Sequence, residues 1–215
     1  MNYPVASILS QNITLLYDRL DLPSVNIDEL KQLPGAETQP MVMATPEMVV
    51  VMYPSEHVVI QIGDRRVRLT LPEPNAELGS APLPEFAQQC NRLVRKASSN
   101  LVAYGFNYDV LVGMGDSNAN ELSIEIFIAD RNKVESAIQG KLMSFAPRFR
   151  FQREQKRYDL VLEPVDEHHI QAHFNSHSEF ANIGLPSAGR LRKSFHEEFS
   201  FLSSILKSIF GGYAC

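Results

Sequence analysis

Histidines dominate the residues of this chain that could do chemistry. Five of the six fall between residues 168 and 196, and they are His168, His169, His173, His177 and His196. Imidazole is the commonest metal ligand and the side chain that most readily gains or loses a proton near neutral pH. No catalytic fingerprint accompanies the cluster, so the sequence does not by itself define an activity.

If residues 168–175 form a strand, Ile170, Ala172 and Phe174 point to one face and the side chains between them to the other. The second face is polar and carries His169, His173 and His177. Four residues of strand span about 13 Å, too far for two imidazoles to bind one zinc ion at about 2 Å without ligands from neighbouring strands. The spacing predicts a polar histidine face with no metal and no cofactor. A metal-dependent enzyme that uses the 168–177 histidine cluster is a second alternative.

A basic and aromatic segment precedes the histidines. Its cations could bind phosphate or an acidic partner, and they are Arg148, Arg150, Arg153, Lys156 and Arg157. Phe149 and Phe151 alternate with Arg148 and Arg150. In a two-layer fold the rings would therefore face the core, where they are unavailable for stacking on bases. What remains is an arginine ladder on the outer face, and the competing interpretation is an ordinary salt-bridged surface.

The last predicted helix, residues 189–210, carries more apolar surface than one stripe requires. Its main stripe comprises Leu191, Phe195, Phe199, Leu202, Leu206 and Ile209. Phe201, Ile205 and Phe210 lie on flanking faces, which predicts an oligomer contact, most simply a symmetric homodimer. Because Phe195 and Phe199 point inward, we expect the acid–base candidates His196, Glu197 and Glu198 on the solvated side of this helix.

The composition is that of an ordinary globular protein, with 44% apolar residues, 21% charged residues and a net charge of −5. That charge disfavours a surface built throughout for nucleic acid but permits a local basic patch. Only Cys90 and Cys215 are present, which fits a reducing compartment better than a disulfide scaffold. Residues 1–20 do not read as a secretory signal, and no apolar run approaches the roughly 20 residues of a membrane-spanning helix. We expect a cytoplasmic protein with no membrane partner.

Hydrophobic periodicity predicts the elements that position these residues. Alternation indicates strands within residues 48–71, at 104–112, and in a second meander at 145–152, 157–163 and 168–175. Helical spacing indicates helices after Asn26, which could cap one, and at residues 84–97, 132–142 and 189–210. Residues 121–130 fit both periods, and we favour a strand there.

These expectations combine into one α+β domain over residues 1–215, with a possible sub-boundary in the proline-rich connector 72–84. We expect antiparallel sheets of six to eight short strands, packed against an internal helix and the long C-terminal helix. Incomplete catalytic motifs favour a non-enzymatic interaction or assembly subunit that oligomerises through the C-terminal helix. The alternative is a nucleic-acid or phosphate-binding module that uses the basic strand 148–157.

Overall fold

A single antiparallel sheet of nine strands organises the chain. The computed structural model describes residues 5–33, 39–72, 82–97, 100–179 and 184–211. The strands are β1 (Val5–Tyr17), β2 (Met41–Ala44), β3 (Val49–Tyr53), β4 (Val58–Gly63), β5 (Arg66–Leu71), β6 (Leu101–Gly113), β7 (Arg148–Arg153), β8 (Lys156–Pro164) and β9 (His169–Glu179). Their order across the sheet is β2-β3-β4-β5-β1-β6-β9-β8-β7. The edges are therefore β2 and β7, and the two longest strands, β1 and β6, pair at the centre.

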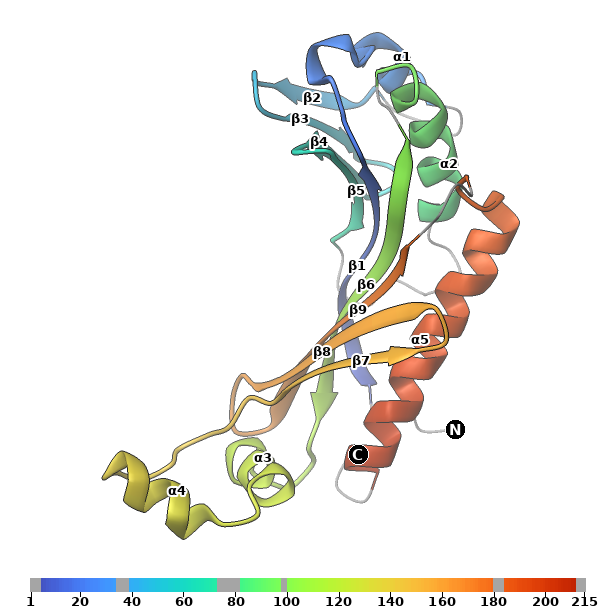
Figure 1. Cartoon of the computed structure of the whole chain (residues 1–215). Helices are drawn as coiled ribbons and strands as arrows, with labels where there is room; N and C mark the ends of the chain where they lie inside the picture. The colour runs from blue at the N-terminus through green and yellow to red at the C-terminus, as the bar shows by residue number, and fades with distance from the viewer. Residues whose placement is uncertain (1–4, 34–38, 73–81, 98–99, 180–183, 212–215) are drawn as a thin grey trace.

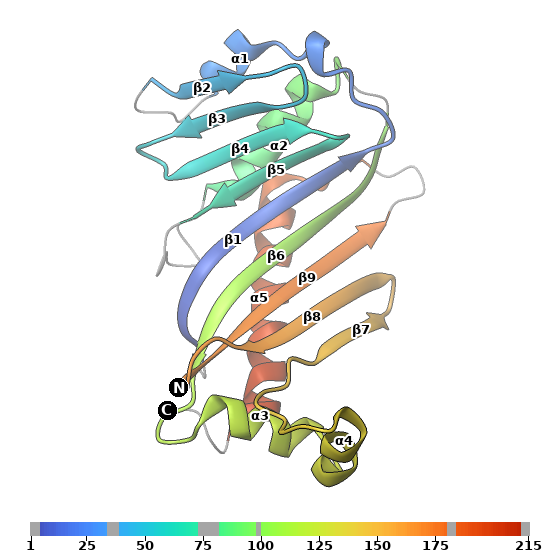
Figure 2. The same ribbon diagram turned by 90° about the vertical axis from the view of Figure 1, so that its left-hand side faces the viewer.

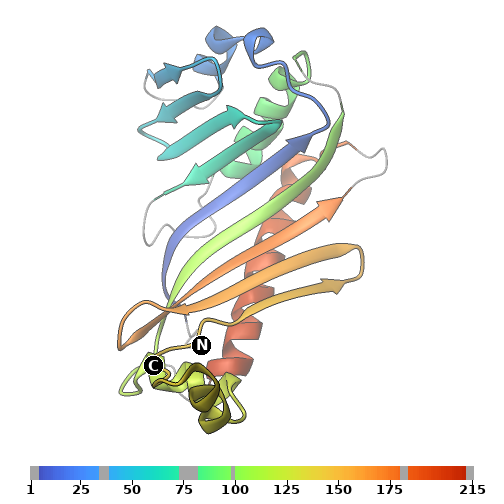
Figure 3. The same cartoon turned by 60° about the vertical axis from the view of Figure 1, so that its left-hand side comes forward.

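The helices divide into a covering layer and an appended arm. They are α1 (Ile27–Lys31), α2 (Leu83–Val94), α3 (Ala119–Phe127), α4 (Arg131–Ile138) and α5 (Ala188–Phe210). Helices α2 and α5 lie against one face of the twisted sheet, which we call the helix-covered face (Figure 1). Figures 2 and 3 look onto the opposite, open face, with the strands in front of α5. Helices α3 and α4 form an arm beyond one end of the sheet.

Alternating side chains explain why the sheet has one apolar face. Buried and partly exposed residues alternate along β4 and β9, as the period of two in an extended chain requires. The core between sheet and helices is rich in aromatic rings, and the Tyr108 and Phe195 ring centroids lie 4.9 Å apart. The Tyr108 hydroxyl also donates a 2.6 Å hydrogen bond to the Phe195 carbonyl. These contacts fix α5 over the central strands.

Several predicted elements are confirmed. The strands within 48–71 are β3, β4 and β5, the second meander is β7, β8 and β9, and α5 covers all of the predicted residues 189–210. The Asn26 side chain accepts hydrogen bonds from the backbone N–H groups of Asp28 and Glu29, so it caps α1 as expected. The α+β class holds in this coarse sense, although the sheet dominates the fold.

Three expectations about the elements are wrong. There is one sheet of nine strands rather than several sheets with six to eight short strands, and β1 and β6 each contain 13 residues. Residues 119–127 form α3 rather than a strand, because the Asn118 side chain accepts hydrogen bonds from the N–H groups of Asn120 and Glu121. The helix expected at 132–142 is shorter and ends at Ile138.

The sheet continues across the proline-rich connector. Strand β5 precedes the connector and β6 follows it, and both pair with β1. Most of the predicted sub-boundary, residues 73–81, falls outside the described residues. None of the helices in the described ranges is long and apolar enough to cross a membrane.

Candidate binding surfaces

The histidine face lies on the open side of the sheet. His169, His173 and His177 are partly or largely exposed along β9, whereas Ile170, Ala172 and Phe174 are buried against the helix layer. Each histidine has its own acidic neighbour. The His169 Nδ1 atom lies 2.9 Å from Asp166, His173 contacts Asp109, and the His177 Nε2 atom lies 3.8 Å from Glu179. The three imidazoles are therefore spread along the strand and do not converge.

The surroundings of His173 and His177 shift their pKa values in opposite directions. The hydrogen bond to Asp109 raises the pKa of His173 above its ordinary value, because it favours the protonated ring. Burial lowers the pKa of His177, because desolvation disfavours the charged form. We therefore do not expect the histidines of this face to gain their protons together at one pH. Within the described part of the chain, no group of three or more His, Cys, Asp or Glu side chains could hold a metal ion.

The structure divides the basic strand between the two faces. Arg148, Arg150 and Arg157 lie on the open face, in register with β8 and β9. On the other side, the Arg153 guanidinium lies 4.8 Å from the centre of the Phe201 ring, and Lys156 Nζ lies 2.5 Å from Glu198 Oε1. The five cations thus do not form one surface.

The open-face arginines of the basic strand already have acidic partners. Arg148 makes a bidentate contact with Asp159, with nitrogen–oxygen distances of 2.8 and 2.5 Å. Arg150 Nε lies 3.2 Å from the same carboxylate, and Arg157 lies 3.0 Å from Glu179. Because the Phe149 and Phe151 rings lie on the opposite side of β7, they provide no stacking platform beside these arginines.

Glu198 differs from the sequence expectation of a solvated position. It is 4% exposed and turned into the core, where its carboxylate contacts Lys156 and lies 3.5 Å from the Tyr158 hydroxyl. Glu197 lies on the outer side of α5, 3.7 Å from Lys193, and His196 is half-buried. Glu198 faces inward because β8 supplies a cation, Lys156, that faces α5. Helix periodicity alone contains no information about the opposite layer.

An apolar groove runs between β7 and α5. Its volume is 570 Å³, and its apolar lining comprises Phe149, Phe151, Leu160, Phe201, Ile205 and Ile209. Phe149 is 37% exposed, so part of its ring is accessible from the groove. Of the three residues predicted as an oligomer contact, Phe201 and Ile205 line this groove and are partly exposed. Phe210 is fully buried in the core of its own chain, so its ring is unavailable to a partner.

The outer edge of β7 borders the same groove. No strand of the described residues pairs with this edge. The Leu162 N–H donates to the Pro147 carbonyl at 3.0 Å, so Pro147 and Leu162 form a hydrogen-bonded pair. Because such pairs alternate along an antiparallel ladder, the backbone groups of Phe149 and Phe151 turn towards β8. Those of Arg148, Arg150 and Gln152 turn outward.

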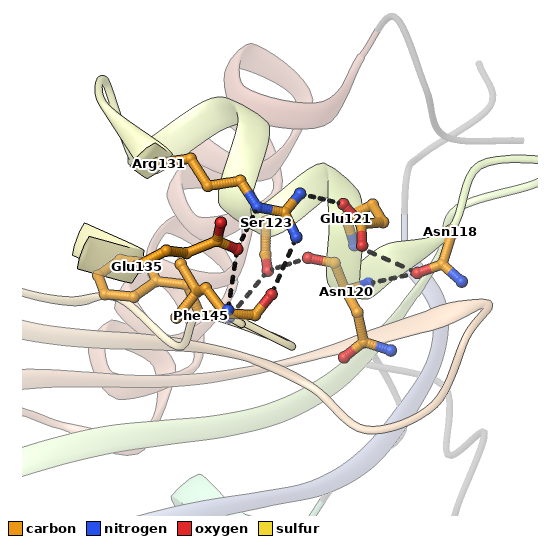
Figure 4. Close-up of polar contacts among 8 residues, drawn as sticks. Asn118, Asn120, Glu121, Ser123, Arg131, Glu135 and Phe145 are labelled. Carbon is orange, nitrogen blue, oxygen red and sulfur yellow. Dashed lines mark hydrogen bonds and ion pairs between the residues drawn. The ribbon is translucent and has the colours of Figure 1, made fainter. Parts of the chain in front are cut away.

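The α3–α4 arm holds the start of β7 in place (Figure 4). Arg131 contacts Glu121 at 2.6 Å and Glu135 at 2.9 Å, and it donates a 3.0 Å hydrogen bond to the Leu142 carbonyl. The Phe145 N–H donates to the Ser123 hydroxyl at 3.2 Å. These bonds tie the segment that leads into β7 to α3. The Phe127 and Phe149 ring centroids lie 5.7 Å apart, so α3 also packs against a ring that lines the groove.

Sequence reasoning missed the groove as a site. It assigned Phe149 and Phe151 to a core face, and the pairing of that face with α5 depends on tertiary structure. No protein-family model matches the sequence, and a search of curated proteins finds no match. Any functional conclusion therefore rests on the surfaces of this molecule.

Proposed function

We propose that this protein is a non-enzymatic interaction subunit that binds a protein partner along the groove between β7 and α5. The observation that supports it is the combination of an open apolar groove with an unpaired strand edge. Exposed contiguous apolar surface is costly in water and commonly marks a protein contact. A strand edge is a template for another strand, which natural proteins usually block or cover.

The geometry fits a partner that adds a strand to β7. The outward N–H and C=O groups of Arg148, Arg150 and Gln152 would bond to the incoming backbone. Alternate side chains of the added strand would then enter the apolar groove beside Phe201 and Ile205. The remaining side chains would lie on the open face next to Arg148 and Arg150. Apolar and acidic residues in alternation would satisfy both sides.

The charge on β7 favours a foreign partner over a second copy of this chain. If two β7 edges paired symmetrically around Arg150, the two Arg150 side chains would lie directly opposite one another. Like charges opposite each other destabilise a strand pair. Arg150 is 70% exposed and makes a single contact with Asp159 through Nε, so its other guanidinium nitrogens are open to an acidic side chain. A homodimer through Phe201 and Ile205 is the competing arrangement.

The test uses a labelled synthetic peptide of alternating valine and glutamate, with a valine–lysine peptide of equal length for comparison. Fluorescence anisotropy should show saturable binding of the acidic peptide and much weaker binding of the basic one. Phe201→Glu places a charge in the groove and should weaken binding at least about tenfold, because a buried apolar contact becomes an unpaired charge. Sedimentation of the free protein measures self-association in parallel.

The matched control is Ser204→Glu, which adds the same charge to the exposed side of α5. It should leave peptide affinity unchanged. Equal binding of both peptides, or equal loss in Phe201→Glu and Ser204→Glu, contradicts strand addition at this groove. A dimer that Phe201→Glu dissociates and Ser204→Glu preserves would keep the contact surface but replace the foreign partner with a second copy. A monomer that binds neither peptide overturns the proposal.

A further inference from the structure

A second hollow lies in the middle of the open face, away from the β7 edge. Its volume is 220 Å³, and it spans β5, β1, β6 and β9. The lining residues that could bind a ligand are Arg66, Arg68, Asn107, Asn175 and His177. Cross-strand register brings them together, since Arg68 pairs with Thr14, Thr14 with Gly105, and Gly105 with His177. Four strands from separate parts of the sequence therefore build the hollow.

The lining of this hollow contains two arginines and no carboxylate. Among the ion pairs of the described residues, Arg148, Arg150 and Arg157 each have an acidic partner, whereas Arg66 and Arg68 have none. The acidic side chains of Glu47 and Asp64 line a separate hollow that Arg66 and Arg68 also border. In a chain with a net charge of −5, such a site is unusual.

Electrostatic repulsion between Arg66 and Arg68 destabilises the fold when no anion lies between them. They lie two residues apart on one face of β5, which places their Cα atoms about 6.6 Å apart. Their cross-strand neighbours in β1 and β4 are uncharged, namely Leu16 and Gly63 for Arg66, and Thr14 and Gln61 for Arg68. An oxyanion between the guanidinium groups would relieve the repulsion and accept charge-assisted hydrogen bonds.

Neutral groups around the arginines suit the same ligand. Asn107 Nδ2 donates to Asn12 Oδ1 at 2.6 Å, and Asn175 Nδ2 donates to Asn107 Oδ1. Each amide nitrogen has a second N–H, which these hydrogen bonds do not use. Gly105 has no side chain to fill the hollow, and a Cβ atom there would lie 2.9 Å from the Ser176 carbonyl oxygen. The floor of the hollow is therefore kept open by close backbone packing.

We infer that this hollow binds an oxyanionic group, a carboxylate or a phosphate, between the guanidinium groups of Arg66 and Arg68. Complete small-molecule pockets commonly measure about 300 to 1,000 Å³, so the hollow suits a charged headgroup better than a whole large ligand. The β7 edge takes no part in the site. The anion site and the partner groove can therefore be tested separately.

The experiment is an NMR titration that follows the arginine Nε–H and asparagine side-chain signals. Inorganic phosphate is the probe in one arm and succinate in the other, which distinguishes a phosphate ligand from a carboxylate ligand. In at least one arm, the signals of Arg66, Arg68 and Asn175 should shift together and saturate. The double variant Arg66→Gln/Arg68→Gln should weaken binding of the same probe at least about tenfold, because it removes both charge-assisted contacts.

Two further variants make the result decisive. Arg92→Gln removes one positive charge from exposed α2 on the other side of the molecule and should leave binding unchanged. Gln61→Glu places a carboxylate next to Arg68 in the register and should weaken binding by supplying an internal counter-charge. Shifts at Arg66 and Arg68 that never saturate, or that match those of Arg92 in both arms, overturn the inference. Saturable binding that survives both the double variant and Gln61→Glu also overturns it.

Discussion

The two faces of the β7–β8 hairpin place similar charges in different environments. On the helix-covered face, Lys156 pairs with Glu198, and the Glu198 side chain is 6% exposed. On the open face, Arg148 and Arg150 share Asp159, with side chains that are 53%, 70% and 26% exposed. A charge whose partner is removed in a buried site has no water to replace it, whereas an exposed charge does. The face, rather than the type of ion pair, should decide the energetic contribution.

The largest expected effect comes from Lys156→Met, which leaves Glu198 buried without its cation. The free energy of unfolding should fall by about 2 to 4 kcal/mol, somewhat less than for a fully buried pair because Lys156 retains some exposure. Urea unfolding measures this change. Adding Glu198→Gln to the same variant should restore part of the loss, since the uncompensated charge is then removed. A loss in Lys156→Met no larger than that in Asp159→Asn would break the comparison between the faces.

A smaller and pH-dependent effect is expected from His173→Gln on the open face. The raised pKa of His173 means that its pairing with Asp109 stabilises the fold below the ordinary histidine pKa and is lost as pH rises through the raised value. Burial raises the pKa of Asp109, but the hydrogen bonds from His173 and Ser10 outweigh burial, so the pKa is lowered overall. The stabilisation from the His173–Asp109 pair is therefore also lost as pH falls through the range in which the Asp109 carboxylate becomes protonated. The variant should lose about 1 kcal/mol near pH 5.5 and less near pH 9.

His177→Gln provides the matched comparison on the same strand. Because burial lowers the pKa of His177, protonation of this residue opposes folding in acid. Replacing it should therefore stabilise the protein relative to the wild type as pH falls below the ordinary histidine pKa. Urea unfolding at several pH values measures the change in unfolding free energy of each variant relative to the wild type. Plotted against pH, this change should have slopes of opposite sign for His173→Gln and His177→Gln. Parallel slopes would contradict the separate environments of His173 and His177.

The smallest expected effect comes from Asp159→Asn. This change removes the shared partner of two largely exposed arginines, and the free energy of unfolding should fall by no more than about 0.5 kcal/mol. Arginine Nε–H signals of Arg148 and Arg150 should nevertheless change, because their hydrogen bonds to the carboxylate are altered. The same urea measurement used for Lys156→Met makes the comparison direct. A loss above that of His173→Gln would indicate that the open face is less solvated than its exposure suggests.

The sequence could predict the elements in which one face is buried throughout. Strands β7, β8 and β9 and helix α5 show the period that their burial requires, and the Asn26 cap was evident from its position before Asp28 and Glu29. Strand β1 was not predicted, because Leu16 interrupts the alternation of the buried Ile13, Leu15 and Tyr17 with polar residues. Helix α3 was assigned as a strand because its apolar residues also fit a period of two, and the decisive signal was the cap at Asn118.

The candidate sites were harder to predict because they depend on pairs of elements. The sequence around Arg66 and Arg68 predicted only a strand. That their cross-strand partners are uncharged follows from the register with β1 and β4. The groove required α5 to lie beside an edge strand, which no local pattern specifies. Alternation correctly placed Phe149 and Phe151 on the face opposite the arginines, but it could not show that this face ends at an open edge.

The central pairing of β1 with β6 also affects how the chain folds as it is synthesised. The last residue of β1 is Tyr17 and the first of β6 is Leu101, so at common elongation rates roughly four to seventeen seconds separate their synthesis. During that interval β1 can pair only with β5, and its other edge has no native neighbour. A long unpaired strand edge on a nascent chain invites aggregation. A chaperone that shields β1 until β6 emerges should therefore raise the yield of native protein.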